Sequence, residues 1–203
     1  MQIRKEESKD YAAVEMLTRE AFWNVYRPGC MEHYVLHVLR TNDAFVPELD
    51  YVLEEEEGQI VAHIAYAEGT LRTEADSRNL LLFGPVSVLP AYQGQGYGAK
   101  LIAFTLERAQ ELGYDAVVIT GAPAYYSRFG FESASKYGIF YDGMDPKEEC
   151  PFFMVKFLNE TAAGAVRGMY SDPPCYFADP EKVEAFDRTF PPKVKEKRPG
   201  QLE

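Results

Sequence analysis

Apolar residues change from strand-like to helix-like spacing between residues 80 and 113, and this change is the clearest pattern in the chain. Residues 80–88 (LLLFGPVSV) form an apolar, partly β-branched run of strand length. From Ala99 onward, apolar residues recur at helical spacing until Gly113, which is typical of a helix end. The pattern therefore predicts a buried strand, a short connection at residues 91–98 and a helix that follows it.

The connection reads AYQGQGYG and places glycine at every second position, at Gly94, Gly96 and Gly98. Glycine allows unusual backbone conformations and lets another molecule approach the backbone amides closely. The connection also meets the N-terminus of the helix, where free N–H groups and the helix dipole favour an anion. The stretch therefore predicts a phosphate or pyrophosphate site. The alternative is a connector whose glycines serve only close packing of the strand and the helix.

Two common phosphate-binding motifs do not fit this connection. A P-loop requires Lys-Ser or Lys-Thr after its last glycine, whereas here Gly98 is followed by Ala-Lys-Leu, which lacks the hydroxyl that holds Mg²⁺. A dinucleotide-binding turn requires glycines at positions one, three and six and an acid at the end of the next strand. Here Asp115 begins the next strand instead of ending it, so a dinucleotide-binding site is only weakly supported. The missing hydroxyl after Gly98 excludes a nucleoside triphosphatase.

The N-terminal half predicts a short strand followed by two helices. Residues 2–4 are the strand candidate, and Ser8 or Asp10 can cap a first helix that runs to Phe22. A second helix is expected over residues 31–40. Its expected inward residues are Tyr34, Val35, Val38 and Leu39.

An antiparallel hairpin is expected next, because residues 49–53 and 59–66 flank a run of four glutamates that reads as a solvated turn. His63 lies between apolar residues of the second strand, which favours a hydrogen-bonded core histidine over a catalytic one. Three aromatic residues at the end of the first helix either belong to the core or line an acceptor pocket. They are Phe22, Trp23 and Tyr26.

The second half predicts a strand at residues 114–120, so that strand, helix and strand form a right-handed crossover with parallel strands. That topology places the glycine-rich connection at the carboxyl ends of the strands, where ligands bind. Residues 124–131 read as a short aromatic helix ending at Gly130. Residues 133–151 are loop-like and acidic, and residues 152–157 return as a strand.

Composition bounds the function classes. The chain has 203 residues, enough for one sizeable core, and its net charge of −11 argues against a nucleic-acid surface. The three cysteines have neither zinc-site nor disulfide spacing, which predicts thiols in a reducing compartment. There is no N-terminal signal region and no apolar run of about 18 residues, so we expect a cytoplasmic protein with no membrane segment.

The connection resembles the coenzyme A loop of the GNAT acetyltransferase superfamily, whose signature is Gln or Arg, two residues, Gly, one residue, then Gly or Ala. Here these positions are Gln93, Gly96 and Gly98. A second signature, Tyr, three residues and Gly-Phe, fits Tyr126 and the Gly-Phe pair at residues 130–131, as in a subgroup with a short PAYYxRFGF-type helix. The resemblance covers residues 1 to about 160.

The resemblance implies an α+β, GNAT-like acyl-CoA N-acyltransferase fold, in which a mixed, splayed sheet is flanked by helices. It also implies an enzyme that moves acetyl from acetyl-CoA to an amine by direct attack, without a metal. The acceptor is left open as a small-molecule or peptide amine, and a homodimer is left open as the assembly. The alternative is a CoA-binding regulatory domain or pseudoenzyme, and a third reading is a dinucleotide oxidoreductase.

The resemblance also implies the site residues. Backbone N–H groups from Gln93 to Ala99 would hold the pyrophosphate, and the strand edge at residues 85–88 would pair with pantetheine. The backbone N–H of Val86 or Val88 would bond the oxyanion. Tyr126 would return a proton to the departing thiolate, and Tyr125 is the alternative candidate for this role. A further alternative is that both tyrosines only pack the helix on the sheet. The expected cofactor-binding residues are Val86, Ser87, Val88, Gln93, Gly94, Gln95, Gly96, Tyr97, Gly98, Ala99, Ala124, Tyr125 and Phe129.

Two departures from the family pattern concern the acceptor side. Residues 120–123 read TGAP and lack the asparagine that often precedes the tyrosine. Residues 80–88 contain no acid that could take the amine proton. The proton therefore leaves through water or through an acid such as Glu20, or it is already absent when the amine substrate binds.

We expect residues 1–160 to form the acetyltransferase domain and residues 161–203 to form a C-terminal extension. The extension contains one short helix around residues 180–187 and four aromatic residues, which predicts that it docks in part on the domain. Residues 193–203 have the polarity of a disordered end.

Overall fold

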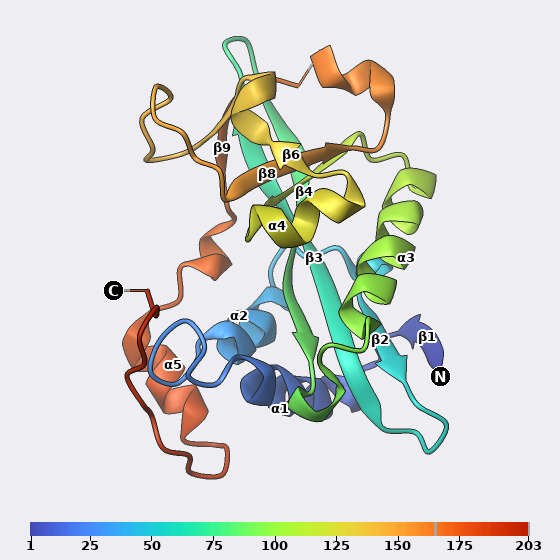
Figure 1. The fold of residues 1–203 in the computed structure, drawn as a ribbon, viewed down its shortest axis with the longest axis vertical. Helices are drawn as coiled ribbons and strands as arrows, with labels where there is room; N and C mark the ends of the chain where they lie inside the picture. Colours follow the sequence, from blue (N-terminus) through green and yellow to red (C-terminus); the bar gives the residue numbers. More distant parts are fainter. Residues whose placement is uncertain (165, 203) are drawn as a thin grey trace. The chain divides into compact units, whose positions relative to one another are not determined.

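A computed structural model describes residues 1–164 and 166–202 of the chain (Figure 1). The chain forms two compact units. The first comprises Met1–Ala65, Pro85–Ile102 and Pro174–Glu203, and the second comprises Tyr66–Gly84 and Ala103–Pro173. Among the described residues, no helix combines the length and apolar character needed to cross a membrane.

The secondary structure follows the predicted order. The helices are α1 (Tyr11–Phe22), α2 (Glu32–Leu39), α3 (Tyr97–Glu111), α4 (Pro123–Tyr126) and α5 (Pro180–Asp187). The strands are β1 (Gln2–Lys5), β2 (Tyr51–Glu54), β3 (Ile60–Arg72), β4 (Ser77–Val88), β5 (Ala116–Thr120), β6 (Glu132–Ser133), β7 (Ile139–Tyr141), β8 (Phe153–Phe157) and β9 (Gly168–Ser171). Short 3₁₀ turns connect several of them.

The first unit contains the antiparallel strands β1, β2 and the beginning of β3, which confirms the predicted hairpin. Leu53 of β2 lies opposite Ile3 of β1 on one side and Ala62 of β3 on the other. Helices α1 and α2 pack against each other, and Thr18 of α1 shares a buried 2.9 Å hydrogen bond with Ser87 of β4. This bond fixes α1 against the last residues of β4.

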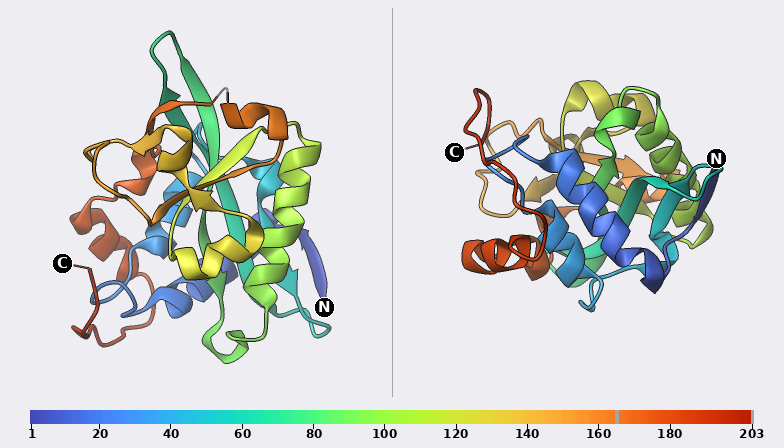
Figure 2. Two further views of the ribbon diagram at one scale, coloured as in Figure 1. Left: turned by 45° about the horizontal axis from the view of Figure 1, so that its top comes forward. Right: turned by 90° about the horizontal axis from the view of Figure 1, so that it is seen from below.

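The inward face of α2 differs from the predicted one. The structure buries His33, Val35, Leu36 and Leu39, whereas Tyr34 and Val38 are half-buried. The reason is the C-terminal helix α5, which packs on α2 (Figure 2). Its Phe186 ring lies 5.3 Å from the ring of His33. A pattern of apolar spacing cannot anticipate a histidine that is buried by a distant segment.

In the second unit, β4 pairs in parallel with β5 at Leu81↔Val117, as the predicted crossover requires. Strand β5 continues the sheet through antiparallel β8 to β6. The end of β3 pairs with β9, which in turn pairs in parallel with β7. The loop expected over residues 133–151 is therefore wrong at β7. Strands this short carry no periodic signal of their own and form because a neighbouring strand supplies hydrogen-bonding partners.

The C-terminal segment contains the predicted helix α5, which begins after Asp179, whose side chain accepts a 2.9 Å bond from the Glu181 N–H. The end expected to be disordered makes specific hydrogen bonds up to residue 202. Trp23 Nε1 donates to the Val194 carbonyl at 2.8 Å, and the Leu202 N–H donates to the Tyr26 carbonyl at 2.8 Å. Residues 165 and 203 of the predicted extension lie outside the described residues, and the domain boundary near residue 160 stays a prediction.

Candidate functional site

The end of β4 leads into residues 93–99, which we call the glycine loop. The Leu89 N–H donates to the Val61 carbonyl of β3 at 2.9 Å, which ties down the chain directly after β4. A 3₁₀ turn over Pro90–Tyr92 follows, closed by the Tyr92 N–H, which donates to the Leu89 carbonyl at 2.8 Å. The loop therefore starts from a fixed point in the first unit.

Two of the three glycine positions require glycine because of their backbone conformation. Gly94 has a φ of +74° and Gly96 a φ of +85°, a conformation that L-residues with side chains rarely adopt. A Cβ atom at either position would meet no heavy atom within 4 Å, so the loop is open to an approaching molecule. Gly98 has no positive φ and is buried in the first turn of α3.

The loop presents a row of backbone donors. The Gln93 N–H, expected among these donors, is instead bonded within the protein, because it donates to the Pro90 carbonyl at 3.3 Å. Within the described part of the chain, no oxygen accepts from the N–H groups of residues 94–99. The first N–H to return to the helix pattern is that of Lys100, which donates to the Gly96 carbonyl at 3.0 Å. Six consecutive donors at the positive end of a 15-residue helix are an arrangement that physically suits phosphate oxygens, and their role toward a ligand stays a prediction.

The glutamine side chains of the loop point back to the backbone rather than outward. Gln93 Nε2 donates to the Val88 carbonyl at 3.0 Å, and Gln95 Nε2 donates to the Ala91 carbonyl at 3.1 Å. Both bonds join the loop to the residues just before it. The signature glutamine therefore braces the loop, and the main-chain amides remain as its open donors.

The predicted strand edge occupies the end of β4. Ser87 is fully buried, and its hydroxyl shares a hydrogen bond with that of Thr18, so its side chain is not available to a ligand. Val86 and Val88 are half-buried. In the second unit, the β4–β5 ladder has only the pairs Leu81↔Val117 and Leu82↔Val118, although β5 continues to Thr120. Gly84, with a φ of +149°, interrupts regular strand geometry just beyond that ladder.

The predicted general acid lies in the second unit. Tyr126 ends α4, and its ring packs near Phe83 at 6.0 Å and Phe131 at 6.1 Å between ring centroids. A Cβ atom at Gly121 would lie 2.4 Å from this ring, so glycine there is what lets the ring approach the backbone. The rival Tyr125 instead carries the Arg128 guanidinium 4.1 Å above its ring.

The predicted site residues thus fall into two groups. The structure brings residues 86–88 and 93–99 together in the first unit. It brings Tyr125 and Tyr126 together with Phe129, through ring contacts of 5.7 and 6.5 Å, in the second unit. Ala124 is exposed on the same short helix. The role of each residue toward a ligand stays a prediction.

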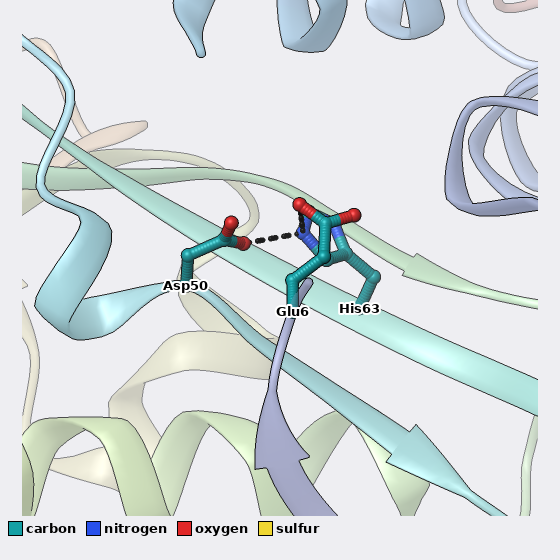
Figure 3. A group of neighbouring side chains, drawn as sticks. All are labelled: Glu6, Asp50 and His63. Carbon is teal, nitrogen blue, oxygen red and sulfur yellow. Dashed lines mark hydrogen bonds and ion pairs between the residues drawn. The ribbon is translucent and has the colours of Figure 1, made fainter. Parts of the chain in front are cut away.

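Sequence reasoning did not identify a buried polar cluster formed by Glu6, Asp50 and His63 (Figure 3). His63 Nε2 lies 2.7 Å from Asp50 Oδ1 and 3.9 Å from Glu6 Oε2, and the side chains of His63 and Glu6 are fully buried. Burial raises the pKa of Glu6 to about 8 and lowers the pKa of His63 to about 4. These three residues lie on different segments, so only the strand register reveals their proximity.

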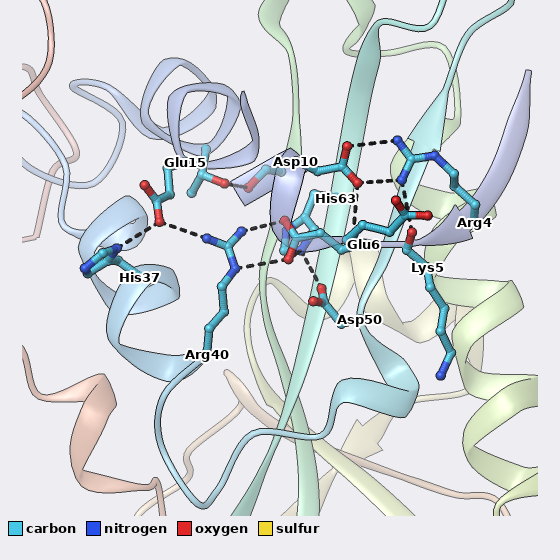
Figure 4. A network of polar contacts seen from close by, with 12 residues as sticks. Arg4, Lys5, Glu6, Asp10, Glu15, His37, Arg40, Asp50 and His63 are labelled. Atoms are coloured by element: carbon cyan, nitrogen blue, oxygen red, sulfur yellow. Dashed lines mark hydrogen bonds and ion pairs between the residues drawn. The ribbon is translucent and has the colours of Figure 1, made fainter. Parts of the chain in front are cut away.

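These side chains are of metal-ligand type, but both carboxyl oxygens of Glu6 are already bonded to Arg40 and His63 Nε2 is bonded to Asp50. Arg40 binds both oxygens of Glu6, with Nη2–Oε1 at 2.5 Å and Nε–Oε2 at 3.0 Å, and it also reaches Glu15 at 2.8 Å (Figure 4). The positive charge of Arg40 beside Glu6 disfavours the binding of a metal cation at the same carboxylate. We therefore read the cluster as a proton-sharing hydrogen-bond network, in keeping with the core role expected for His63.

A second buried group joins α1, α2 and α5. Cys30 Sγ lies 3.2 Å from His33 Nδ1, and His33 Nε2 lies 3.3 Å from Asp187 Oδ1, an order that resembles a nucleophile, base and acid. However, Arg19 pairs with Asp187 at 2.7 Å, and burial raises the pKa of Cys30 to about 12 and lowers that of His33 to about 4. The thiol therefore stays protonated, and this group serves to dock α5.

The acid proposed as a route for the amine proton is also occupied. Glu20 Oε2 accepts from Lys193 Nζ at 2.5 Å, and both side chains are about one-third exposed. Of the three aromatic residues at the end of α1, Trp23 is buried and Tyr26 is 47% exposed. Trp23 therefore belongs to the core of the first unit.

Comparison with known proteins identifies the family. The sequence model of the acetyltransferase (GNAT) domain matches residues 48–133. The Escherichia coli (strain K12) protein named "Uncharacterized N-acetyltransferase YhbS" is 32% identical over 139 residues, which is 68% of this chain and 78% of that protein. This chain belongs to the GNAT family of N-acetyltransferases.

Solved structures of other GNAT proteins share the fold. E. coli YhbS in complex with CoA has a TM-score of 0.76 at 27% identity, covering 87% of this chain and 92% of that one. A GNAT acetyltransferase from Brucella melitensis in complex with acetyl-CoA has a TM-score of 0.68 at 28% identity, covering 86% and 97%. The predicted fold, a mixed sheet flanked by helices, and the predicted class, an acetyl-CoA-dependent N-acetyltransferase, are confirmed.

Proposed function

We propose that the glycine loop binds the pyrophosphate of acetyl-CoA and that the protein transfers the acetyl group to a small-molecule or peptide amine. The observation that carries this proposal is the row of six N–H groups at residues 94–99, which have no acceptor within the described chain. Hydrogen bonds from backbone N–H groups to an anion are charge-assisted and short, so such a row suits a diphosphate better than a neutral ligand. CoA and acetyl-CoA in the two similar structures support this choice.

The remaining contacts follow the order of the chain. The backbone edge at residues 85–88 would pair with the amides of pantetheine, and the N–H of Val86 or Val88 would stabilise the oxyanion. The amine nitrogen attacks the acetyl carbonyl carbon, the C–S bond breaks, and the thiolate takes a proton from Tyr126. The nitrogen releases one proton to solvent as the amide forms, and solvent returns a proton to the tyrosinate. The amine must arrive neutral or lose its proton to water, because Glu20 is paired with Lys193.

A second function, CoA binding without turnover, is supported by the lack of an available acid to take the amine proton. No acid stands in residues 80–88, and the acid suggested on α1 is occupied. Release of free thiol from acetyl-CoA across a panel of amines separates the two functions, because only the enzyme releases it. We propose the cytoplasm as the location, in keeping with three cysteines that form no disulfide among the described residues.

The loop proposal is tested by replacing Gly96 with valine. The side chain would force a residue with a Cβ atom into a φ of +85° and fill the space in front of the amides. We expect CoA binding, measured by calorimetric titration, to fall below detection. The matched control is Gly143→Val, because Gly143 has the same φ of +85° and equally open surroundings but lies in the second unit. Undiminished affinity in a folded Gly96→Val protein would contradict the proposal.

A further inference from the structure

Tyr92 joins the start of the glycine loop to the turn between β2 and β3. Its hydroxyl lies 3.1 Å from Glu55 Oε2 and 3.4 Å from Gln59 Oε1. Glu55 and Gln59 face each other across that turn, where the Glu55 N–H donates to the Gln59 carbonyl at 3.0 Å and the Gly58 N–H donates to the Glu55 carbonyl at 3.0 Å. The hydroxyl therefore meets both sides of a closed turn, and all of these residues belong to the first unit.

The same residue also contacts the far end of the loop. The ring of Tyr92 lies 6.2 Å from the ring of Tyr97, the first residue of α3. Tyr92 and Tyr97 thus enclose the stretch that contains Gly94 and Gly96 with their positive φ angles. A side chain that is fixed at the hairpin and touches both ends of this stretch limits how far the loop can move.

Glycine-rich backbone has more conformational freedom to lose than any other, so a loop of this kind binds weakly unless its conformation is set beforehand. The backbone bonds at Leu89 and the Gln93 side chain fix the entrance of the loop. Tyr92 adds a link to the turn between β2 and β3. Holding the loop before the ligand arrives changes binding and leaves the chemical step unaffected.

We propose that Tyr92 is a positioning residue for the cofactor, which acts through Glu55 and Gln59 to hold the glycine loop in the conformation that presents its N–H groups. This inference rests on the proposed function of that loop. Glu55 also brings a second, opposite effect, because it belongs to a run of four glutamates whose charges repel a polyanion. The experiment must therefore separate the hydrogen bond from the charge.

The first variant is Tyr92→Phe, which keeps the ring contact with Tyr97 and removes the bond to the hairpin. We expect the Kd for CoA and the KM for acetyl-CoA to rise roughly threefold to tenfold, the range of one net hydrogen bond, while kcat and the KM for the amine stay unchanged. The matched control is Tyr137→Phe, which removes a similar surface bond, 3.2 Å from Glu132, in the second unit. The proposal would be overturned if the Kd for CoA rose in the control Tyr137→Phe, or if it did not rise in Tyr92→Phe.

The second pair of variants is Glu55→Gln and Glu55→Ala. Glutamine keeps an oxygen that can accept from Tyr92, so Glu55→Gln should bind CoA close to the unmodified protein, while Glu55→Ala should match Tyr92→Phe. The double variant Tyr92→Phe/Glu55→Ala should be no weaker than either single variant, because both remove the same link. Tighter binding in both Glu55 variants would show that charge repulsion dominates and would overturn the positioning role.

Comparison with Gly96→Val distinguishes cofactor binding by the glycine loop from positioning of that loop by Tyr92. If Gly96→Val loses CoA and Tyr92→Phe does not, the loop binds the cofactor and Tyr92 does not position it. If Gly96→Val keeps its affinity for CoA, the proposed function of the loop fails, whatever Tyr92 does. Thermal unfolding of each variant serves as the check on folding, and a loss of stability in Tyr92→Phe with unchanged Kd would make the bond merely structural.

Discussion

At the scale of single residues, Tyr126 combines a packed ring with a hydroxyl whose role is chemical in our proposal. The ring contacts Phe83 and Phe131, and Gly121 provides the space beside it. These contacts remain when the hydroxyl is removed, so the hydroxyl can be tested without disturbing the helix. Tyr125, edge-on to Tyr126 at 4.9 Å, is a matched neighbour with the same chemistry.

We predict that Tyr126→Phe lowers kcat by roughly 100-fold, the low end for acid–base catalysis, while acetyl-CoA still binds. Tyr125→Phe should have a mild effect. Steady-state kinetics with saturating acetyl-CoA and amine provides the measurement. A change in KM alone would make the hydroxyl a binding group, and a kcat defect in Tyr125→Phe instead would move the acid by one residue.

Residue types and spacing were enough to find the glycine loop but not to describe its side chains. The positive φ angles of Gly94 and Gly96 match the expectation that glycine is needed there. The bond from Gln93 to the Val88 carbonyl and the bond from Tyr92 to Glu55 could not be predicted. Both depend on where a rotatable side chain finds a partner, which becomes defined only once the strands have paired.

At the scale of elements, the C-terminal helix α5 is held in the first unit by a buried ion pair. Arg19 is 1% exposed, its guanidinium binds Asp187 at 2.7 Å, and the ring of Trp23 lies 4.2 Å from the same guanidinium. Removal of one member of such a pair leaves the other charged and buried, which costs more than the pair itself contributes.

We predict that Asp187→Ala lowers the free energy of unfolding by roughly 3 kcal/mol, because Arg19 loses its carboxylate partner in a buried position. Urea unfolding followed by circular dichroism provides the measurement. Lys182→Ala is the control, since Lys182 is exposed on the same helix. Equal midpoints for the two variants would mean that α5 docks through its aromatic residues alone.

The limits of α5 were predictable because Asp179 and Pro180 are strong local start signals for a helix. Its partner was not, because Arg19 and Asp187 are far apart in the chain and nothing local marks them as a pair. The same reasoning applies to β7 and β9, which pair with each other across a long intervening segment. Elements with local signals were found, whereas these two contacts, which no local motif marks, were not.

At the scale of the whole molecule, the cluster of Glu6, Asp50 and His63 makes stability depend on pH in two opposite directions. The pKa of Glu6 rises from 4.5 to about 8, mainly through burial, so its contribution is complete below pH 4.5 and is lost as pH rises toward 8. The pKa of His63 falls from 6.5 to about 4, again through burial, so its contribution is complete above pH 6.5 and is lost as pH falls toward 4.

We predict that the free energy of unfolding declines as pH rises from about 7.5 through 8, where His63 is almost entirely neutral in both the folded and unfolded states and Glu6 still titrates. Glu6→Gln keeps the shape of the side chain and removes the titration, so the decline should become smaller in this variant. Urea unfolding at a series of pH values gives the slope, which is independent of the absolute stability of the variant. An unchanged slope would show that Glu6 is ionised throughout this range.

The position of Trp23 has a practical consequence, because it is the one tryptophan of the chain. Its indole is 7% exposed and its Nε1 donates to the carbonyl of Val194, so the C-terminal segment forms part of its surroundings. An indole in contact with water emits at longer wavelength than a buried one. The fluorescence maximum of the unlabelled protein therefore reports whether this segment is in place, and a red shift after mild proteolytic trimming of the C-terminus would record its departure.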